Sequence, residues 1–134
     1  MTAKRDDDWR NLEYTKKKCP VAFGETISMI KAKEAVDELN NKEGSVRFEK
    51  RGCQRVVCAS PTAAIDVCRE PTESVPEVYE KPYSYIADYV TGIMQEWCPK
   101  MKAHSMIPIQ MDWVGGEVSD PAGLAIRLHR DNCK

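Results

Sequence analysis

Apolar residues recur with helical spacing in two segments of this chain. The first segment runs from a potential N-cap at Ser28 through Asn40, and the second runs from near Ser84 to the residue before Pro99. The apolar stripes consist of Ala32, Ala35, Val36 and Leu39 in the first segment and of Ile86, Val90, Ile93 and Trp97 in the second. Because Gly92 costs about 1 kcal/mol relative to Ala, the second helix must be held by packing.

Short runs of alternating or β-branched residues predict the strands. They cover residues 21–27, 53–58, 63–68, 107–113 and 124–129. The second and third runs flank the turn Ser60-Pro61-Thr62 and therefore predict an antiparallel hairpin. Prolines and acidic residues at positions 70–82 predict an exposed loop, and residues 41–51 form a charged connection.

The order of these elements is strand, helix, strand, strand, helix, strand, with room for an additional strand near the C-terminus. This is the order of the ferredoxin-like βαββαβ fold, an α+β two-layer sandwich of helices on an antiparallel sheet. We therefore expect one domain over residues 19–134. Residues 1–18 carry charged runs without periodicity and are expected to form a flexible arm, unless Trp9 docks on the domain.

Composition limits the function further. The chain has 134 residues, 42% of them hydrophobic, and a formal net charge of -1. This charge argues against a general electrostatic affinity for nucleic acid or anionic membranes. No run approaches the roughly 20 apolar residues of a membrane span. The chain also lacks an apolar signal-peptide core, so an exported form would have lost its targeting segment.

The cysteines favour an extracellular protein. An even number in so short a chain is typical of a disulfide framework, which persists in oxidising compartments. The six residues are Cys19, Cys53, Cys58, Cys68, Cys98 and Cys133.

The hairpin register predicts how these cysteines pair. With the turn centred on Ser60-Pro61, Cys53 faces Cys68, while Arg55 faces Asp66 on the same side of the sheet. Cys58 would point toward the helices and meet Cys98, which leaves Cys19 for Cys133 on neighbouring first and last strands. Other pairings stay open, because a shift of one residue in the turn separates Cys53 from Cys68.

Two dibasic pairs are candidate processing sites. Lys4-Arg5 precedes an acidic run and resembles the cleavage site of a kexin-type protease in a fungal secretory pathway, which predicts a mature N-terminus at Asp6. An ordinary charged tail is the alternative. Lys50-Arg51 resembles a second such site, although a solvated loop is the commoner explanation of a charge cluster.

The order of cysteines, strands and helices resembles a known group of proteins. The residues that carry the resemblance are Gly52-Cys53-Gln54-Arg55-Val56-Val57-Cys58, then Ala63-Ala64-Ile65 leading to Cys68, an Ile- and Ala-containing helix ending at Cys98, Gly115-Gly116-Glu117, and a final strand closing on Cys133. Over this span the chain is similar to small secreted fungal effectors that share the fold of the smut killer toxin called killer protein six. The resemblance implies helices on an antiparallel sheet, secretion by a fungus, and a role as a toxin or plant-infection effector. It supplies no catalytic motif.

The residues also allow two other kinds of site. Cys53, Cys58, His129 and Cys133 could bind zinc, but their spacing is looser than in usual zinc sites and two cysteines would be left over. A secreted ribonuclease needs a base, an acid and a cation for the phosphate. Glu117, His129 and Arg127 supply these residue types near the last strand.

We therefore expect a protein that acts by binding, with no catalytic residues, metal or cofactor. The expected function is that of a monomeric fungal virulence effector, secreted into the host apoplast, that binds a host plant protein or cell-surface component. An antifungal toxin acting on competitor membranes is the second hypothesis, and the ribonuclease is the third. Candidates for the binding surface are Trp9, Trp113, Arg127 and His129.

Overall fold

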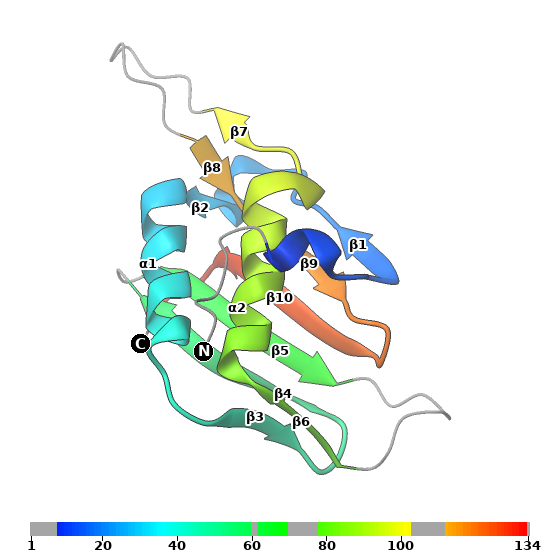
Figure 1. Ribbon diagram of the computed structural model, residues 1–134. Coiled ribbons are helices and arrows are strands. Elements are labelled where there is room, and N and C mark those ends of the chain that lie inside the picture. The colour runs from blue at the N-terminus through cyan, green and yellow to red at the C-terminus, as the bar shows by residue number, and fades with distance from the viewer. Residues whose placement is uncertain (1–7, 60–61, 70–77, 103–111, 134) are drawn as a thin grey trace.

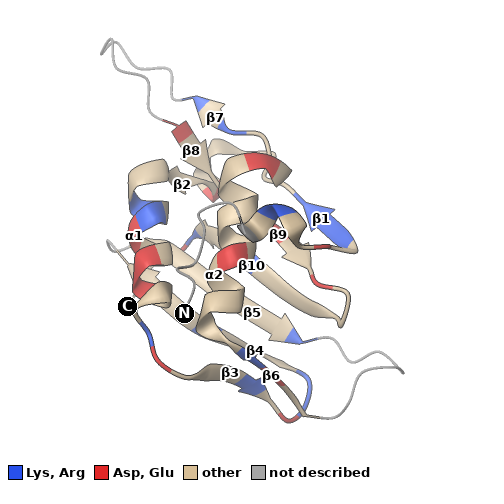
Figure 2. Ribbon diagram, viewed as in Figure 1, with Lys and Arg blue, Asp and Glu red and all other residues tan. Residues whose placement is uncertain are grey.

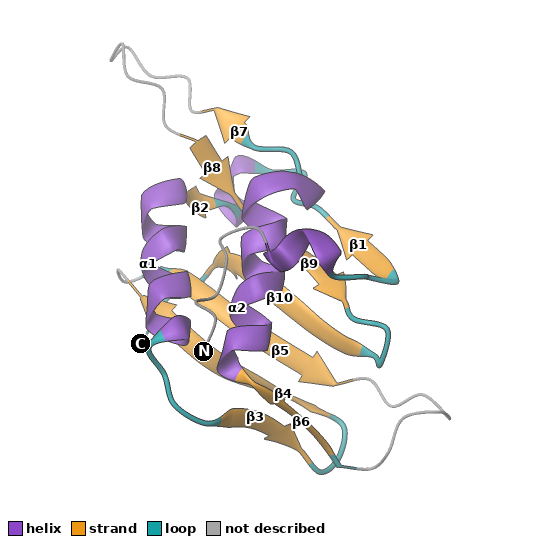
Figure 3. Ribbon diagram, viewed as in Figure 1, coloured by secondary structure: helices purple, strands orange, loops and turns teal. Residues whose placement is uncertain are grey.

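A computed structural model describes residues 8–59, 62–69, 78–102 and 112–133. Its central element is a five-stranded antiparallel sheet with the strand order β1-β9-β10-β5-β4. Both α-helices lie against one face of this sheet, as Figures 1 and 3 show. The strands are β1 (Lys16–Lys18), β4 (Gly52–Ala59), β5 (Ala63–Arg69), β9 (Gly116–Ser119) and β10 (Leu124–Arg130).

Two smaller antiparallel sheets extend this layer. One has the strand order β2-β8-β7, and the other pairs β3 with β6. Their bounds are β2 (Ile27–Ser28), β3 (Ser45–Phe48), β6 (Tyr79–Pro82), β7 (Met101–Lys102) and β8 (Asp112–Val114). The coarse prediction of an α+β protein with antiparallel sheets is confirmed, but the ferredoxin-like strand arrangement is not.

Two segments differ from the predicted elements. Residues 21–27 were expected to form a strand, but Phe23–Glu25 is a short 3₁₀ helix and β2 begins only at Ile27. The end of the predicted loop 70–82 is instead β6, which pairs with β3. The reason is that β3 buries Val46 and Phe48, so its backbone groups need a partner strand.

The helices form where the apolar stripes predict them. α1 covers Met29–Asn40, and the Ser28 side chain accepts a hydrogen bond of 3.3 Å from the Lys31 amide at its first turn. α2 covers Tyr83–Gly92 and continues as a π-helical turn over Ile93–Trp97. No described helix is long and apolar enough to cross a membrane.

The core fills the space between the helices and the inner face of the central sheet. Its largest fully buried side chains come from both layers, which explains why the helices are held to this face. They include Leu39, Ile65, Val67, Ile86, Tyr89, Ile93, Met94, Leu124, Ile126 and Leu128.

The segment expected to be a flexible arm contributes to the fold from residue 8 onward. Trp9 is only 5% exposed and makes an edge-on contact with Trp97, with ring centroids 6.1 Å apart. The Tyr89 hydroxyl donates a hydrogen bond of 2.6 Å to the Glu13 carbonyl. Since β1 then joins the central sheet, the folded unit begins before residue 19. Lys4 and Arg5 lie outside the described residues.

The β4–β5 hairpin has the predicted register through Arg55. Cys53 pairs with Cys68 and Arg55 pairs with Asp66. The Cys53–Cys68 disulfide is present, with its Cα atoms 4.0 Å apart, and confirms that prediction.

A β-bulge follows in β4. Val56 falls outside the ladder of paired residues, and Val57 is the next residue to find a partner on β5. The Val56 carbonyl accepts a hydrogen bond of 2.9 Å from Lys42 Nζ. Because a bulge adds one residue to one strand, it reverses the face to which the following side chains point.

The bulge decides the two remaining disulfides. The predicted register pointed Cys58 toward the helices, but the bulge turns it to the opposite face, in register with Ala64. This position is close to the end of β10, and Cys58 is bonded to Cys133 there. Cys98, at the end of the π turn, is bonded to Cys19. The predicted Cys58–Cys98 and Cys19–Cys133 pairings are therefore wrong. The three disulfides fit an extracellular protein.

Candidate functional site on the open face of the central sheet

The face of the central sheet that points away from α1 and α2 is here called the open face. Strand alternation places polar residues on it, in contrast to the apolar inner face. On β10, for example, Leu124, Ile126 and Leu128 are buried in the core, whereas Arg127 points outward and is exposed. The open face includes Lys16, Lys18, Cys53, Arg55, Cys58, Asp66, Cys68, Glu117, Arg127 and His129.

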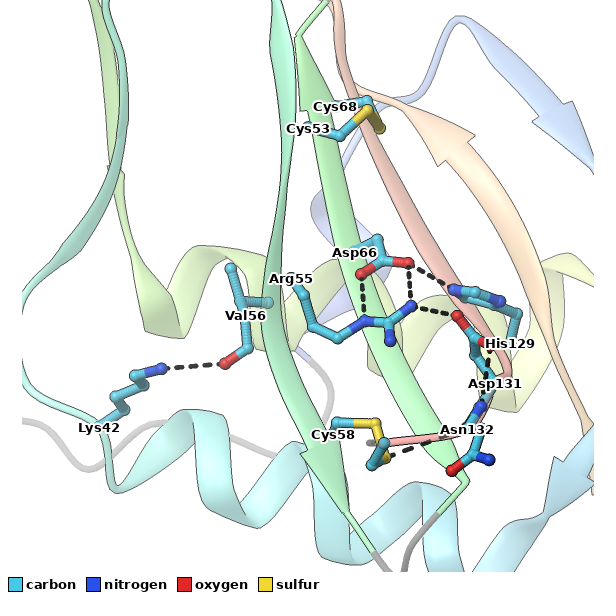
Figure 4. A network of polar contacts seen from close by, with 11 residues as sticks. Lys42, Cys53, Arg55, Val56, Cys58, Asp66, Cys68, His129, Asp131 and Asn132 are labelled. Carbon is cyan, nitrogen blue, oxygen red and sulfur yellow. Dashed lines mark hydrogen bonds and ion pairs between the residues drawn. A yellow bond between two sulfur atoms is a disulfide. The ribbon is translucent and has the colours of Figure 1, made fainter.

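Three of these charged or titratable groups, Arg55, Asp66 and His129, form a network with Asp131 (Figure 4). Arg55 donates to both carboxylate oxygens of Asp66, with Nε–Oδ1 and Nη2–Oδ2 distances of 2.8 and 3.1 Å. Arg55 Nη2 also lies 2.5 Å from Asp131 Oδ2, and His129 Nε2 lies 2.5 Å from Asp66 Oδ2. An ionised carboxylate only accepts hydrogen bonds, so Nε2 of His129 carries the proton.

The network stabilises its charged groups. Burial by itself raises the pKa of Asp66, but hydrogen bonds from Arg55 and His129 outweigh it and hold that pKa below its usual value. The hydrogen bond from Arg55 likewise lowers the pKa of Asp131. Both carboxylates raise the pKa of the Arg55 guanidinium. At neutral pH the Arg55 charge is therefore matched by these carboxylates and is not available to a ligand.

A row of charges of alternating sign crosses the open face, one residue from each strand. Lys18 on β1 faces Glu117 on β9, and Glu117 faces Arg127 on β10. Arg127 in turn faces Asp66 on β5, which faces Arg55 on β4. This set of five residues is called the charge row below.

The two halves of the charge row differ in how far their charges are paired. Asp66 and Arg55 are held in the network described above. Within the part of the chain that the structure describes, the side chains of Lys18, Glu117 and Arg127 make no ion pair or hydrogen bond. The β1–β9–β10 half of the row therefore presents two cations and one carboxylate to solvent.

A depression of about 310 Å³ lies over this half of the row. The loop that connects β1 with β2 closes one side of it, because this loop is tied to the π turn by the Cys19–Cys98 disulfide. Gly116 allows the close approach of that disulfide, since a Cβ atom there would lie 2.6 Å from Cys98 Sγ. The lining residues that carry polar groups are Lys18, Glu25, Glu117, Arg127 and His129.

The predicted binding-surface residues separate into three groups. Arg127 and His129 line the depression, although His129 is only 8% exposed. Trp113 is half-buried elsewhere, on β8, where its ring centroid lies 4.7 Å from that of Phe23. Trp9 is buried against Trp97 and is not an exposed binding residue. That prediction was wrong because the segment before β1 packs on the helical layer.

The chemical alternatives fare differently in the structure. The cysteines of the hypothetical zinc site, Cys53, Cys58 and Cys133, are all oxidised in disulfides, so they offer no thiolate ligands. The three ribonuclease candidates, Glu117, Arg127 and His129, come together at one depression. Lys18 and Asp131 belong to the same face, but sequence reasoning did not select them. The lysine run at 16–18 was the only signal for Lys18.

Comparison with protein-family models, with curated proteins and with solved structures found no match for this chain.

Proposed function

We propose that this chain is a secreted fungal virulence effector that acts by binding a host plant component through the open face, without catalysing a reaction. The proposal includes the fold of the killer protein six group, for which the cysteine and element order of the sequence is the support. Three disulfides in a chain of this length support an extracellular site of action.

The observation that carries the proposal is the unpaired half of the charge row. Three charged side chains on neighbouring strands line a depression without forming an ion pair or hydrogen bond with one another. Leaving these three charged groups without ion pairs adds nothing to the stability of the fold. In the other half of the same row, groups of the same kind do pair, as Arg55 and His129 do with Asp66. Arg is also a residue that often anchors interfaces. Rigid strands therefore display Lys18, Glu117 and Arg127 for an external partner.

The disulfides make this surface rigid. Cys53–Cys68 joins β4 to β5, and Cys58–Cys133 joins β4 to the segment after β10. Cys19–Cys98 fixes the loop beside the depression. A preorganised surface loses less conformational entropy when it binds, which favours affinity.

The test compares oxidised wild type with an Arg127→Glu variant. Both are immobilised and exposed to apoplastic fluid and cell-wall material from a host plant, and both are expressed in the fungus during infection. We expect wild type to retain a plant component that Arg127→Glu fails to retain, and we expect the variant to reduce virulence. Equal retention and equal virulence would contradict the proposal. Killing of competing yeast by the purified protein would favour the antifungal toxin instead.

A ribonuclease is the second candidate, because Glu117, Arg127 and His129 line the same depression. In that function Glu117 would take the proton of the attacking hydroxyl, His129 would protonate the leaving oxygen and Arg127 would stabilise the phosphate. Incubation of the purified protein with RNA tests it. Cleavage that is lost in His129→Ala and Glu117→Gln, with the fold retained, would replace the binding function by this one.

A further inference from the structure

We propose that the depression on the open face binds a uronate unit of an acidic polysaccharide, with Lys18 and Arg127 holding the carboxylate and Glu117 accepting a hydrogen bond from a neighbouring hydroxyl. This inference rests on the proposed function, because it names the chemical class of the host component. It follows from the charges, the size and the rim of the depression.

The charges define what the ligand must carry. Lys18 and Arg127 lie on strands that flank β9, so their backbones are about 10 Å apart and their long side chains can reach one oxyanion. Glu117 lies between them in the charge row, and the other lining carboxylate, Glu25, accepts hydrogen bonds of 3.1 and 3.4 Å from the Val21 and Ala22 amides. A simple anion would be repelled by Glu117, whereas a ligand that has a hydroxyl beside its carboxylate satisfies all three groups. A sugar acid has this combination on every ring.

Size and rim agree with a sugar ring. A volume of about 310 Å³ admits one monosaccharide unit, and the depression is open to solvent on the side away from the β1–β2 loop. Pro20 and Val21 form its apolar rim, and Val21 is 92% exposed. These side chains can cover the C–H face of a sugar. Among the described lining residues there is no Phe, Tyr or Trp, and His129 is only 8% exposed, with its ring held by Asp66. The depression therefore offers little surface on which a nucleobase would stack, which favours an acidic sugar over RNA.

A basic strand edge extends the site. Lys16 and Lys18 point to the same face of β1, about 7 Å apart, because side chains alternate along a strand. β1 is the edge strand of the central sheet, and all three of its residues are exposed lysines, visible as the blue β1 arrow in Figure 2. A polymer with a carboxylate on each unit can follow Arg127, Lys18 and Lys16 out of the depression.

The experiment measures binding of de-esterified polygalacturonate by calorimetry at low and high salt. The same polymer in fully methyl-esterified form is the uncharged control, and inorganic phosphate and a single-stranded RNA oligonucleotide are the competing anions. We expect affinity for the de-esterified polymer that falls with salt, and little affinity for the esterified polymer. Phosphate and RNA should bind more weakly.

The variants locate the site. Arg127→Ala and Lys18→Ala should each weaken polygalacturonate binding about tenfold, the effect of one lost charge-assisted contact. Arg47→Ala on β3 and Lys33→Ala on α1 remove the same charges away from the open face and should change affinity less than about twofold, which measures the effect of net charge alone. Glu117→Gln keeps the acceptor oxygen and removes a repulsive charge, so binding should be unchanged or tighter.

Three results would overturn the inference: equal binding of the esterified polymer, unchanged affinity in Arg127→Ala, or preferential binding of RNA. Each leaves the proposed function standing if a plant component is still retained by the wild-type protein and lost in Arg127→Glu. Conversely, the protein could bind polygalacturonate at this site while the fungus that expresses Arg127→Glu infects normally. That result would contradict the effector function and support the binding site.

Discussion

Arg127 and Asp66 face each other across β10 and β5, yet the carboxylate of Asp66 is engaged by other groups. It accepts hydrogen bonds from Arg55 at 2.8 and 3.1 Å and lies 2.5 Å from His129 Nε2. Asp66 therefore separates the charge row into a paired half that stabilises the sheet and an unpaired half that is available to a ligand.

Replacement of Asp66 by Asn should lower the free energy of unfolding by about 1–3 kcal/mol, because it removes a charge-assisted acceptor and leaves Arg55 and His129 without it. Denaturant unfolding at neutral pH measures the change. Asp131→Asn is the control at the other end of the network, where the side chain is 47% exposed, and should have a smaller effect. Equal losses would contradict the central place of Asp66.

The pKa of Asp66 is lowered in the folded state. Its contribution to the free energy of unfolding is therefore present above the unfolded pKa of 3.8 and disappears as the pH falls through the folded pKa.

Alkaline pH should destabilise the protein through two tyrosines that share a buried carboxylate. Tyr79 and Tyr85 donate their hydroxyl protons to Asp120, which is fully buried. Burial, and then the hydrogen bond to Asp120, raises the pKa of both hydroxyls above the unfolded value of 10.0. Above that pH the unfolded chain releases protons that the folded state retains, so stability falls as pH rises.

Unfolding free energies measured from pH 8 to pH 11 check this prediction, with the decline expected to begin near 10. Tyr85→Phe should make the decline shallower, since one of the titrating groups is removed. A wild-type curve that is flat through this range would contradict the shared carboxylate as a source of pH dependence.

The disulfide pairing can be read directly from non-reduced peptide maps. We expect the pairs Cys19–Cys98, Cys53–Cys68 and Cys58–Cys133, and recovery of a peptide that joins Cys58 to Cys98 would exclude the β-bulge.

Loss of single disulfides should affect stability according to the loop that each one closes. Removing Cys19–Cys98, with a sequence separation of 79, should cost more than removing Cys53–Cys68, with a separation of 15. The loop-entropy relation gives about 4–5 kcal/mol for the first and about 3 kcal/mol for the second. Paired Cys→Ala variants compared by denaturant unfolding provide the measurement.

Gly92→Ala should be destabilising, although Ala is normally the better helix former. A Cβ atom at this position would lie 2.4 Å from the Trp97 ring, and the ring is held by Trp9 and Tyr89. We expect a loss of about 1–3 kcal/mol from overpacking, against a gain of about 1 kcal/mol from helix propensity. Gly24→Ala is the matched control, because nothing lies within 4 Å of its added Cβ atom. A higher melting temperature for Gly92→Ala would show that Trp97 moves aside.

Local patterns in the sequence determined several elements of this protein. The apolar stripes located α1 and α2, and the turn residues Ser60-Pro61 of the sequence, which lie outside the described residues, located the β4–β5 hairpin with the Arg55–Asp66 pair. These features depend on residues close together in the chain, so periodicity and turn chemistry are sufficient to predict them. The even cysteine count likewise indicated that the thiols are paired, but not their partners.

The tertiary structure decided the remaining features. One residue, Val56, has no partner in the β4–β5 ladder. The resulting bulge points Cys58 to the open face, where it forms its disulfide with Cys133. No local pattern predicts the bulge, because the contacts that stabilise it come from other segments of the chain. The hydrogen bond from the Lys42 side chain to the Val56 carbonyl is one of them. The charge row also depends on pairing between strands far apart in sequence, because Lys18 faces Glu117 only where β1 joins the sheet beside β9. Residue types along the chain supplied the charges, and the register of the sheet determined which of them pair and which stay available.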